Sequence, residues 1–267
     1  GDLIATTDAA SGVINLDTLA VDRTVQLTTH GSGNATVVND AGLTFAASTV
    51  GGALNATATT GNMTDSGALT IAGTSSFTTS ANNADITLNN TNALTGAVAL
   101  NTTGSTGNAR IDNGTTALNI AASSVGGNLT LTSGNSITDS GTVTVGGWLR
   151  ATTDANNGLI NLGTLAVDGT VQLTTNGSGN ATVVNDAGLT FAASTVGGAL
   201  SATATTGNMT DSGALTIAGT SSFTTSANNA DITLNNTNAL TGAVALNTTG
   251  STGNARIDNG TTALNIA

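Results

Sequence analysis

The chain has 267 residues and a formal net charge of −11, because it holds 15 acidic residues, all Asp, against four Arg and no Lys. It contains no Cys, which excludes disulfides, thiolate metal sites and cysteine nucleophiles. The negative charge opposes nucleic-acid binding, which needs clustered Lys and Arg. No apolar run approaches the ~18 residues of a membrane-spanning helix, so we expect no nucleic-acid partner and no membrane span.

Short apolar–polar alternations follow one another along the chain, and period two with β-branched residues indicates half-buried strands. In the first half of the chain they fall at 25–27, 43–45, 69–71, 86–88, 98–100, 118–120, 129–131 and 143–145. Segments rich in Gly, Asn and Asp separate them and predict sharp turns. No stretch has sustained helical spacing, so we expect an all-β protein.

The chain is nearly one sequence written twice. Residues 5–121 return as 151–267, an offset of 146 residues, with seven differences over 117 shared positions. The differing pairs are Ala10/Asn156, Ser11/Asn157, Val13/Leu159, Asp17/Gly163, Arg23/Gly169, His30/Asn176 and Asn55/Ser201. We assign repeat unit one to 1–146 and an incomplete unit two to 147–267. Since the chain begins without Met and stops in mid-unit, we expect a segment of a longer or processed protein.

A finer register divides the unit. Strand runs of one kind begin at Leu3, Val25, Leu54, Phe77, Val98, Leu129 and Leu149. From Val25 to Val171 the steps are 29, 23, 21, 31, 20 and 22 residues, which gives six sub-repeats of about 24 residues, mostly with three short strands each. Such a period is typical of a solenoid. We predict a parallel β-helix of about eleven turns, forming a rod of roughly 50 Å.

The alternation places Val, Leu, Ile, Phe and Ala inside and Thr, Asn, Arg and Asp outside. Arg110 and Arg150 each lie next to apolar residues in a strand, so both are predicted to point outward. No charged residue needs to enter the core. The absence of Pro agrees with this fold, because each turn must donate its backbone N–H groups to a neighbour.

The segment 124–147, SVGGNLTLTSGNSITDSGTVTVGG, resembles the repeat regions of filamentous-haemagglutinin-like large secreted bacterial adhesins. These proteins are commonly exported by two-partner secretion, and the resemblance covers essentially the whole chain. It implies a right-handed β-helix and an extended stalk on the bacterial surface. It also implies an outer-membrane transporter as a partner in export.

We assign no catalytic, cofactor-binding or metal-binding residues and expect no cofactor. His30 is the only His, and Asn176 replaces it in the second copy, so we expect a solvated turn residue. Asp65 and Asp139 share a Thr-Asp-Ser-Gly motif but are predicted to lie three turns, or about 14 Å, apart. Glycosidases place their two carboxyl groups ~5–9.5 Å apart. We therefore interpret these Asp residues as hydrogen-bond acceptors in turns and expect no enzyme.

Three further features have both a functional and a structural interpretation. Arg110 and Asp112 flank Ile111 on an outward face, as do Arg256 and Asp258, and we expect a weak exposed pair. Trp148, the lone Trp, either plugs a wide turn or forms an exposed contact. Glycosylation triplets such as those at Asn34, Asn55, Asn101 and Asn113 are expected by chance in so Asn- and Thr-rich a chain.

We hypothesise a structural repeat segment of a secreted filament or surface adhesin stalk, which self-associates along or between filaments. One alternative is an ice-binding Thr-rich solenoid, which needs a regular row of threonines at one strand position. The predicted outward row is irregular and runs Gln26, Asn55, Thr78, Ala99, Thr130 and Arg150. The other alternative is a carbohydrate-active β-helix enzyme, for which the chain has no acid–base cluster.

Overall fold

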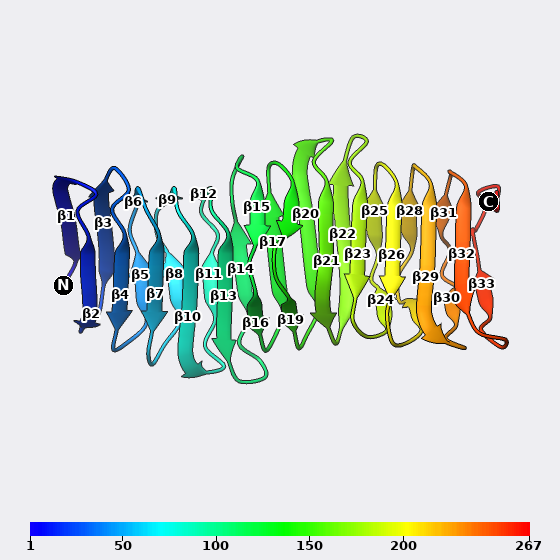
Figure 1. Cartoon of the computed structure of the whole chain (residues 1–267), viewed down its shortest axis with the longest axis horizontal. Helices are drawn as coiled ribbons and strands as arrows, with labels where there is room; N and C mark the ends of the chain where they lie inside the picture. Colours follow the sequence, from blue (N-terminus) through cyan, green and yellow to red (C-terminus); the bar gives the residue numbers. More distant parts are fainter. The chain divides into compact units, whose positions relative to one another are not determined.

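A computed structural model describes all 267 residues, and its secondary structure consists of strands joined by turns. The chain divides into two compact units, Gly1–Gly134 and Asn135–Ala267, which are described separately. In Figure 1 the first unit runs from blue to green and the second from green to red. In both units, parallel strands form two sheets, sheet A and sheet B, as expected of a right-handed parallel β-solenoid.

In unit 1, sheet A holds β1 (Leu3–Ala10), β3 (Thr24–His30), β5 (Leu43–Phe45), β6 (Ser48–Val50), β8 (Met63–Asp65), β9 (Leu69–Ile71), β11 (Ile86–Leu88), β12 (Ala93–Leu94), β14 (Ala109–Asp112) and β17 (Leu129–Ser133). Sheet B holds β2 (Ile14–Leu19), β4 (Ala35–Asn39), β7 (Leu54–Ala58), β10 (Ser75–Asn82), β13 (Val98–Thr103), β15 (Leu118–Ile120) and β16 (Ser123–Val125).

In unit 2, sheet A holds β20 (Leu149–Asn156), β22 (Thr170–Asn176), β24 (Leu189–Phe191), β25 (Ser194–Val196), β27 (Met209–Asp211), β28 (Leu215–Ile217), β30 (Ile232–Leu234), β31 (Ala239–Leu240) and β33 (Ala255–Ile257). Sheet B holds β18 (Ile137–Asp139), β19 (Val143–Val145), β21 (Ile160–Val167), β23 (Ala181–Asn185), β26 (Leu200–Ala204), β29 (Ser221–Asn228) and β32 (Val244–Thr249).

The turns are shorter than the sequence pattern predicted. In sheet B of unit 1, the successive register partners are Ile14, Ala35, Leu54, Ser75 and Val98. The corresponding partners in unit 2, from Ile160 to Val244, have the same spacing. Four turns thus carry the chain from Ile14 to Val98, and at this rate the long repeat holds seven turns instead of six. The chain has about 12 turns instead of eleven.

The predicted register failed because it mixed the two sheets. Val25 lies in sheet A of unit 1, whereas Leu54 lies in sheet B, so the long step between them covers about one and a half turns. The other long step, from Val98 in sheet B to Leu129 in sheet A, has the same origin. Inward residues of both sheets have the same alternation, so hydrophobic pattern alone does not distinguish them.

Most turns have three short strands, as predicted, but the first two turns of unit 1 (β1–β2 and β3–β4) and the turns β20–β21 and β22–β23 of unit 2 have two long strands. The long strand β3 pairs with two short ones, β5 through Thr24↔Thr44 and β6 through Thr28↔Thr49. The chain turns a corner between β5 and β6, where Ala46 donates its N–H to the Val25 carbonyl at 2.9 Å. The inter-turn hydrogen bonds therefore continue across the corner.

Aliphatic and Phe side chains fill the interior of each unit. Leu54, Phe77 and Val98 of unit 1 are 0% exposed, and Phe191 and Phe223 of unit 2 meet edge to face with ring centroids 6.4 Å apart. Complete burial of one such side chain stabilises the fold by roughly 1.5–3 kcal/mol. The predicted inward set, Leu131 and Val145 included, is confirmed.

Leu54→Ala is expected to destabilise unit 1 by about 2–5 kcal/mol, because the cavity would be closed on every side by stacked turns. Urea unfolding followed by circular dichroism measures the change. The matched control is Asn55→Ser, the next residue, which is exposed and is already Ser201 in the second copy. Equal losses in the two variants would contradict the assigned register.

Candidate functional site

The corners of the solenoid contain buried asparagines, which contradicts the prediction that Asn faces water. Six are 7% exposed or less: Asn39, Asn92 and Asn113 in unit 1, and Asn185, Asn238 and Asn259 in unit 2. Each amide bonds to the backbone of another turn. The hydrophobic alternation could not locate them, because they lie where the strands end.

Asn113 shows how one such side chain works. Its Oδ1 accepts a hydrogen bond from the Leu94 N–H at 2.8 Å, and its Nδ2 donates to the Leu94 carbonyl at 3.0 Å and the Ala117 carbonyl at 2.9 Å. Its backbone N–H donates a hydrogen bond to the carbonyl of Thr132 in the following turn at 3.0 Å. The residue therefore satisfies peptide groups that the corner removes from the strand ladder, which would otherwise be costly to bury.

Asp65 is also a structural connector. It is 9% exposed, so the expectation that no charged residue enters the interior is wrong at this position and at Asp211, which is 8% exposed. Its carboxylate accepts hydrogen bonds from the N–H of Asn89 at 3.0 Å and the Nδ2 of Asn92 at 2.9 Å. A carboxylate with such donors can be buried.

Asp139 of unit 2 has a similar role, as the Thr-Asp-Ser-Gly motif predicted. Its carboxylate accepts hydrogen bonds from the N–H of Gly163 at 3.0 Å and from the N–H and hydroxyl of Thr164 at 2.8 and 2.9 Å. Both aspartates thus bond to the turn that follows them.

His30 lies exposed at the end of β3, with its Nδ1 2.7 Å from the Thr7 carbonyl oxygen of the preceding turn. In unit 2, the Nδ2 of Asn176 donates to the carbonyl of Thr153, the counterpart of Thr7, at 3.2 Å. The His-to-Asn difference between the copies therefore preserves one inter-turn hydrogen bond.

Arg110 and Asp112 do not form the expected pair. The chain's one salt bridge joins Arg23 to Asp2, with 3.6 Å between Nε and Oδ1. Asp112 instead accepts the N–H of Gly114 at 2.9 Å, and Asp258 accepts that of Gly260 at 2.8 Å in unit 2. The outward direction predicted for Arg110 and Arg150 is confirmed.

The glycosylation triplets differ in accessibility. Asn34 and Asn55 are exposed, Asn101 is half-buried and Asn113 is fully buried. The structure brings together no three His, Cys, Asp or Glu side chains that could hold a metal ion. The structure contains no helix long and apolar enough to cross a membrane.

Regular rows of threonine cover sheet A, in contrast to the irregular outward row predicted from the mixed register. In unit 1, one row of register partners is Thr24, Thr44, Thr64 and Thr87, and a second is Thr6, Thr28, Thr49 and Thr70. The hydroxyls of Thr44 and Thr64 are 3.0 Å apart. Unit 2 repeats both rows with the same register.

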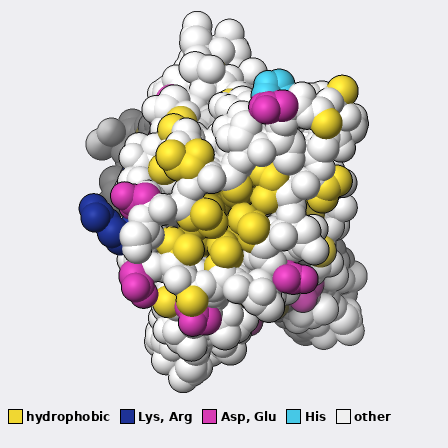
Figure 2. Space-filling model, turned by 90° about the vertical axis from the view of Figure 1, so that its left-hand side faces the viewer, with side chains coloured by type: hydrophobic (Ala, Val, Ile, Leu, Met, Phe, Trp, Pro, Cys, Tyr) yellow, Lys and Arg dark blue, Asp and Glu magenta, His cyan; other side chains and the backbone are white.

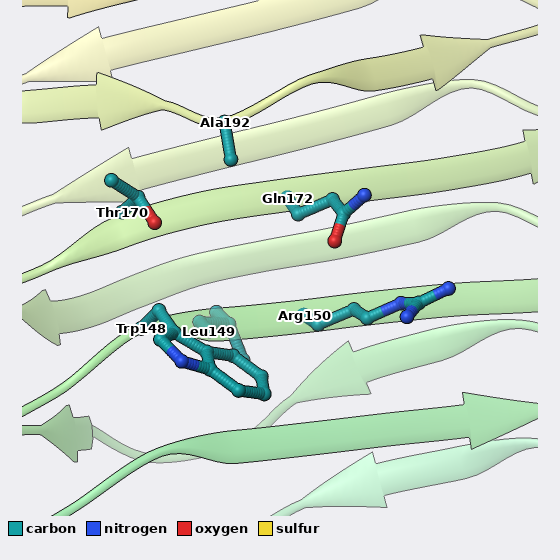
Figure 3. Close-up of a pocket in the computed structure, with 6 residues that line it drawn as sticks. All are labelled: Trp148, Leu149, Arg150, Thr170, Gln172 and Ala192. Atoms are coloured by element: carbon teal, nitrogen blue, oxygen red, sulfur yellow. The ribbon is translucent and has the colours of Figure 1, made fainter. Parts of the chain in front are cut away.

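A hollow of about 290 Å³ lies on the outer face of sheet A in unit 2. Figure 3 shows the six residues that line it. Its lining residues are Trp148, Leu149, Arg150, Thr170, Gln172 and Ala192. Trp148 is 42% exposed, which favours the exposed contact over the plug for a wide turn. Arg150 and Gln172 are register partners on β20 and β22.

The corresponding place in unit 1 carries a carboxylate. Asp2 occupies the repeat position of Trp148, and it accepts hydrogen bonds from the hydroxyl and N–H of Thr24 at 2.8 and 3.2 Å. These two bonds, with a smaller contribution from Arg23, hold the pKa of Asp2 below its usual value. The same scaffold position therefore stabilises a negative charge in unit 1.

The fold and its polar corners define this protein as a parallel β-solenoid of tandem repeats. The model of the family described as repeats of unknown function (DUF5649) matches residues 32–101, 106–162 and 178–247, well over half of the chain. The chain belongs to this family. Comparison with curated proteins found no match, and comparison with solved structures found none either.

The family matches reveal a shorter repeat that the sequence analysis missed. The three matches begin at positions 32, 106 and 178, so that each starts about half of a long repeat after the one before it. Within unit 1, Ala35 of β4 and Leu54 of β7 in sheet B correspond to Ala109 of β14 and Leu129 of β17 in sheet A. Each family repeat therefore spans about three and a half turns and exchanges the two faces of the solenoid.

Asn113→Ala is expected to cost about 2–4 kcal/mol, because the N–H and C=O of Leu94 would lose their partners inside the wall. Hydrogen exchange at the Leu94 amide measures the local effect and should become much faster. Asn119→Ala is the matched control: the buried Oδ1 of Asn119 has no hydrogen-bond partner, so its loss should cost little. Unchanged protection of Leu94 in Asn113→Ala would contradict this role.

Proposed function

We propose that this chain is a structural repeat segment of a secreted filament or a bacterial surface adhesin, where stacked copies extend a stalk. The observation that carries the proposal is the placement of the differences between the copies. All seven differences within residues 5–121, and the two that precede them at Asp2 and Ile4, fall at exposed residues of unit 1, and the buried residues are identical. What the two copies share is the set of contacts that stacks one turn on the next.

This arrangement suits a protein whose length is its useful property. Solenoid stability is a sum over repeats and their interfaces, so a copy can be added without redesign of the others. The side-chain hydrogen bonds at the corners join each turn only to the turns next to it. The sequence resemblance to filamentous-haemagglutinin-like repeats supports an extracellular location, and it implies export through an outer-membrane transporter.

Self-association is the partner that we propose for the stalk. The face of unit 1 formed by β1 and β2 has exposed apolar side chains, including Ile4 at 69% and Val13 at 62% exposure. Figure 2 shows hydrophobic side chains gathered in the middle of this face, with acidic side chains toward its margin. Strand edges beside apolar side chains suit the stacking of a further turn, whether that turn belongs to the same protein or to another copy.

Insertion of one further copy of the long repeat after Arg150 is expected to lengthen the particle by about 34 Å, which is seven turns at about 4.8 Å each. Small-angle scattering measures the maximum dimension and the cross-section, and the cross-section should stay constant. Growth in the cross-section instead would contradict a stalk.

Antibodies against the chain should also label intact source cells, and labelling only after permeabilisation would refute surface display.

The threonine rows favour one second candidate, an ice-binding face on sheet A. Hydroxyls repeated at about 4.8 Å along a row can order water regularly. Thr49→Lys is then expected to reduce thermal hysteresis without abolishing it, since Thr49 is exposed in the middle of a row and unit 2 keeps its own rows. Asn55→Lys on sheet B is the matched control and should leave hysteresis unchanged. Absence of hysteresis in the parent protein would exclude this function.

A further inference from the structure

We propose that the hollow around Trp148 in unit 2 binds a pyranose sugar that carries a carboxylate, a hexuronate unit of an acidic saccharide. This site goes beyond the proposed stalk function and does not depend on it, because all the lining residues belong to one face of one unit. The argument rests on the exposed side chains of the hollow and on its counterpart in unit 1.

The hollow combines one apolar surface with polar groups. Trp148 exposes 42% of its surface, whereas all four Phe of the chain are fully buried. A pyranose has a C–H face that packs on an aromatic ring and an equatorial rim of hydroxyls. Binding sites of this kind pair an aromatic surface with a few placed polar groups.

Three polar side chains next to the ring are available to a ligand. Arg150, Gln172 and Thr170 form no hydrogen bond or ion pair through their side chains within the protein. Figure 3 shows the indole at the start of β20, the Arg150 side chain extended along the same strand, and Gln172 and Thr170 on β22 beside them. A guanidinium binds a carboxylate with two parallel hydrogen bonds. The amide and the hydroxyl can bind sugar hydroxyls.

Unit 1 shows that this scaffold position accepts a carboxylate. There Asp2 replaces Trp148 and Ile4 replaces Arg150, while Thr24, Gln26 and Ala46 match Thr170, Gln172 and Ala192. The Asp2 carboxylate accepts a hydrogen bond from the hydroxyl of Thr24 at 2.8 Å. Unit 2 lacks this aspartate and carries Arg150 nearby, so the carboxylate of a bound ligand can lie beside Thr170 and Arg150.

The net charge narrows the ligand class. At −11 the chain repels a dense polyanion such as a nucleic acid, although an aromatic ring beside an arginine could otherwise stack a base. Arg150 equally disfavours a quaternary ammonium ligand on the indole. A sugar with one carboxylate suits one aromatic ring, one guanidinium and two neutral hydrogen-bonding groups.

The test uses Trp148 as its own reporter, because it is the only Trp in the chain. Titration of the full chain with trigalacturonate should change the indole emission saturably, with a Kd of about 0.1–1 mM for so open a site. The uncharged methyl ester of the same trisaccharide should bind at least fivefold more weakly. Equal binding of acid and ester, or no saturable change with either, would overturn the proposal.

The test variants exchange residues between corresponding positions of the two units. Arg150→Ile should remove the preference for the acid over the ester. Trp148→Asp should abolish binding in calorimetry, with circular dichroism unchanged because the side chain is exposed. The double variant Asp2→Trp, Ile4→Arg should raise the stoichiometry from one site to two. A stoichiometry that stays at one, or competition by acetate as strong as by trigalacturonate, would refute sugar recognition by this constellation.

Discussion

The structure depends on one constraint: each turn must satisfy the backbone groups of the turn beside it, at the corners as well as along the strands. Strand ladders meet this demand on the flat faces. At the corners the backbone bends away, and a buried peptide group left there is costly. Asparagine meets the demand, since a side-chain amide offers the donor and the acceptor of a peptide group. Asn39 does this for Val21, with its Oδ1 2.9 Å from the Val21 nitrogen and its Nδ2 2.8 Å from the carbonyl oxygen.

Glycine columns meet the same constraint where two turns approach most closely. The N–H of Gly52 donates to the Gly33 carbonyl at 2.9 Å, and that of Gly73 donates to Gly52 at 2.9 Å. A Cβ on Gly51 would clash with the Gly31 carbonyl of the turn below. The Val-Gly-Gly segments of the sequence are therefore places where only backbone fits between turns. This packing explains why these positions are occupied by glycine.

Period two predicted the strands and the inward residues correctly, because burial of alternate side chains is a local property. Turn length is not local: Val25 and Leu54 have the same alternation but lie on different sheets. The buried Asn113 escaped prediction for a related reason. An asparagine in Asp-Asn-Gly has the composition of an exposed turn, and only the neighbouring turn shows that its amide is enclosed. The half-repeat had a visible signal, because the Thr-Asp-Ser-Gly motif occurs at 64–67 and again at 138–141. The search for whole turns missed this repeat, because it spans about three and a half turns.

The division between retained interior and variable exterior also explains how one copy can hold a ligand site that the other lacks. Trp148 directly precedes β20 and Arg150 lies on its outer face, whereas the inward residue between them, Leu149, is shared with unit 1 as Leu3. The exchange of Asp2 for Trp148 removes only exposed contacts between turns, the bonds of Asp2 to Thr24 and Arg23, and leaves the buried contacts in place, so it costs the fold little. In unit 1 the hydroxyl of Thr24 is held by Asp2, and in unit 2 the same hydroxyl, as Thr170, faces a hollow. A solenoid thus supplies a fixed frame on which a binding site requires only two exterior substitutions.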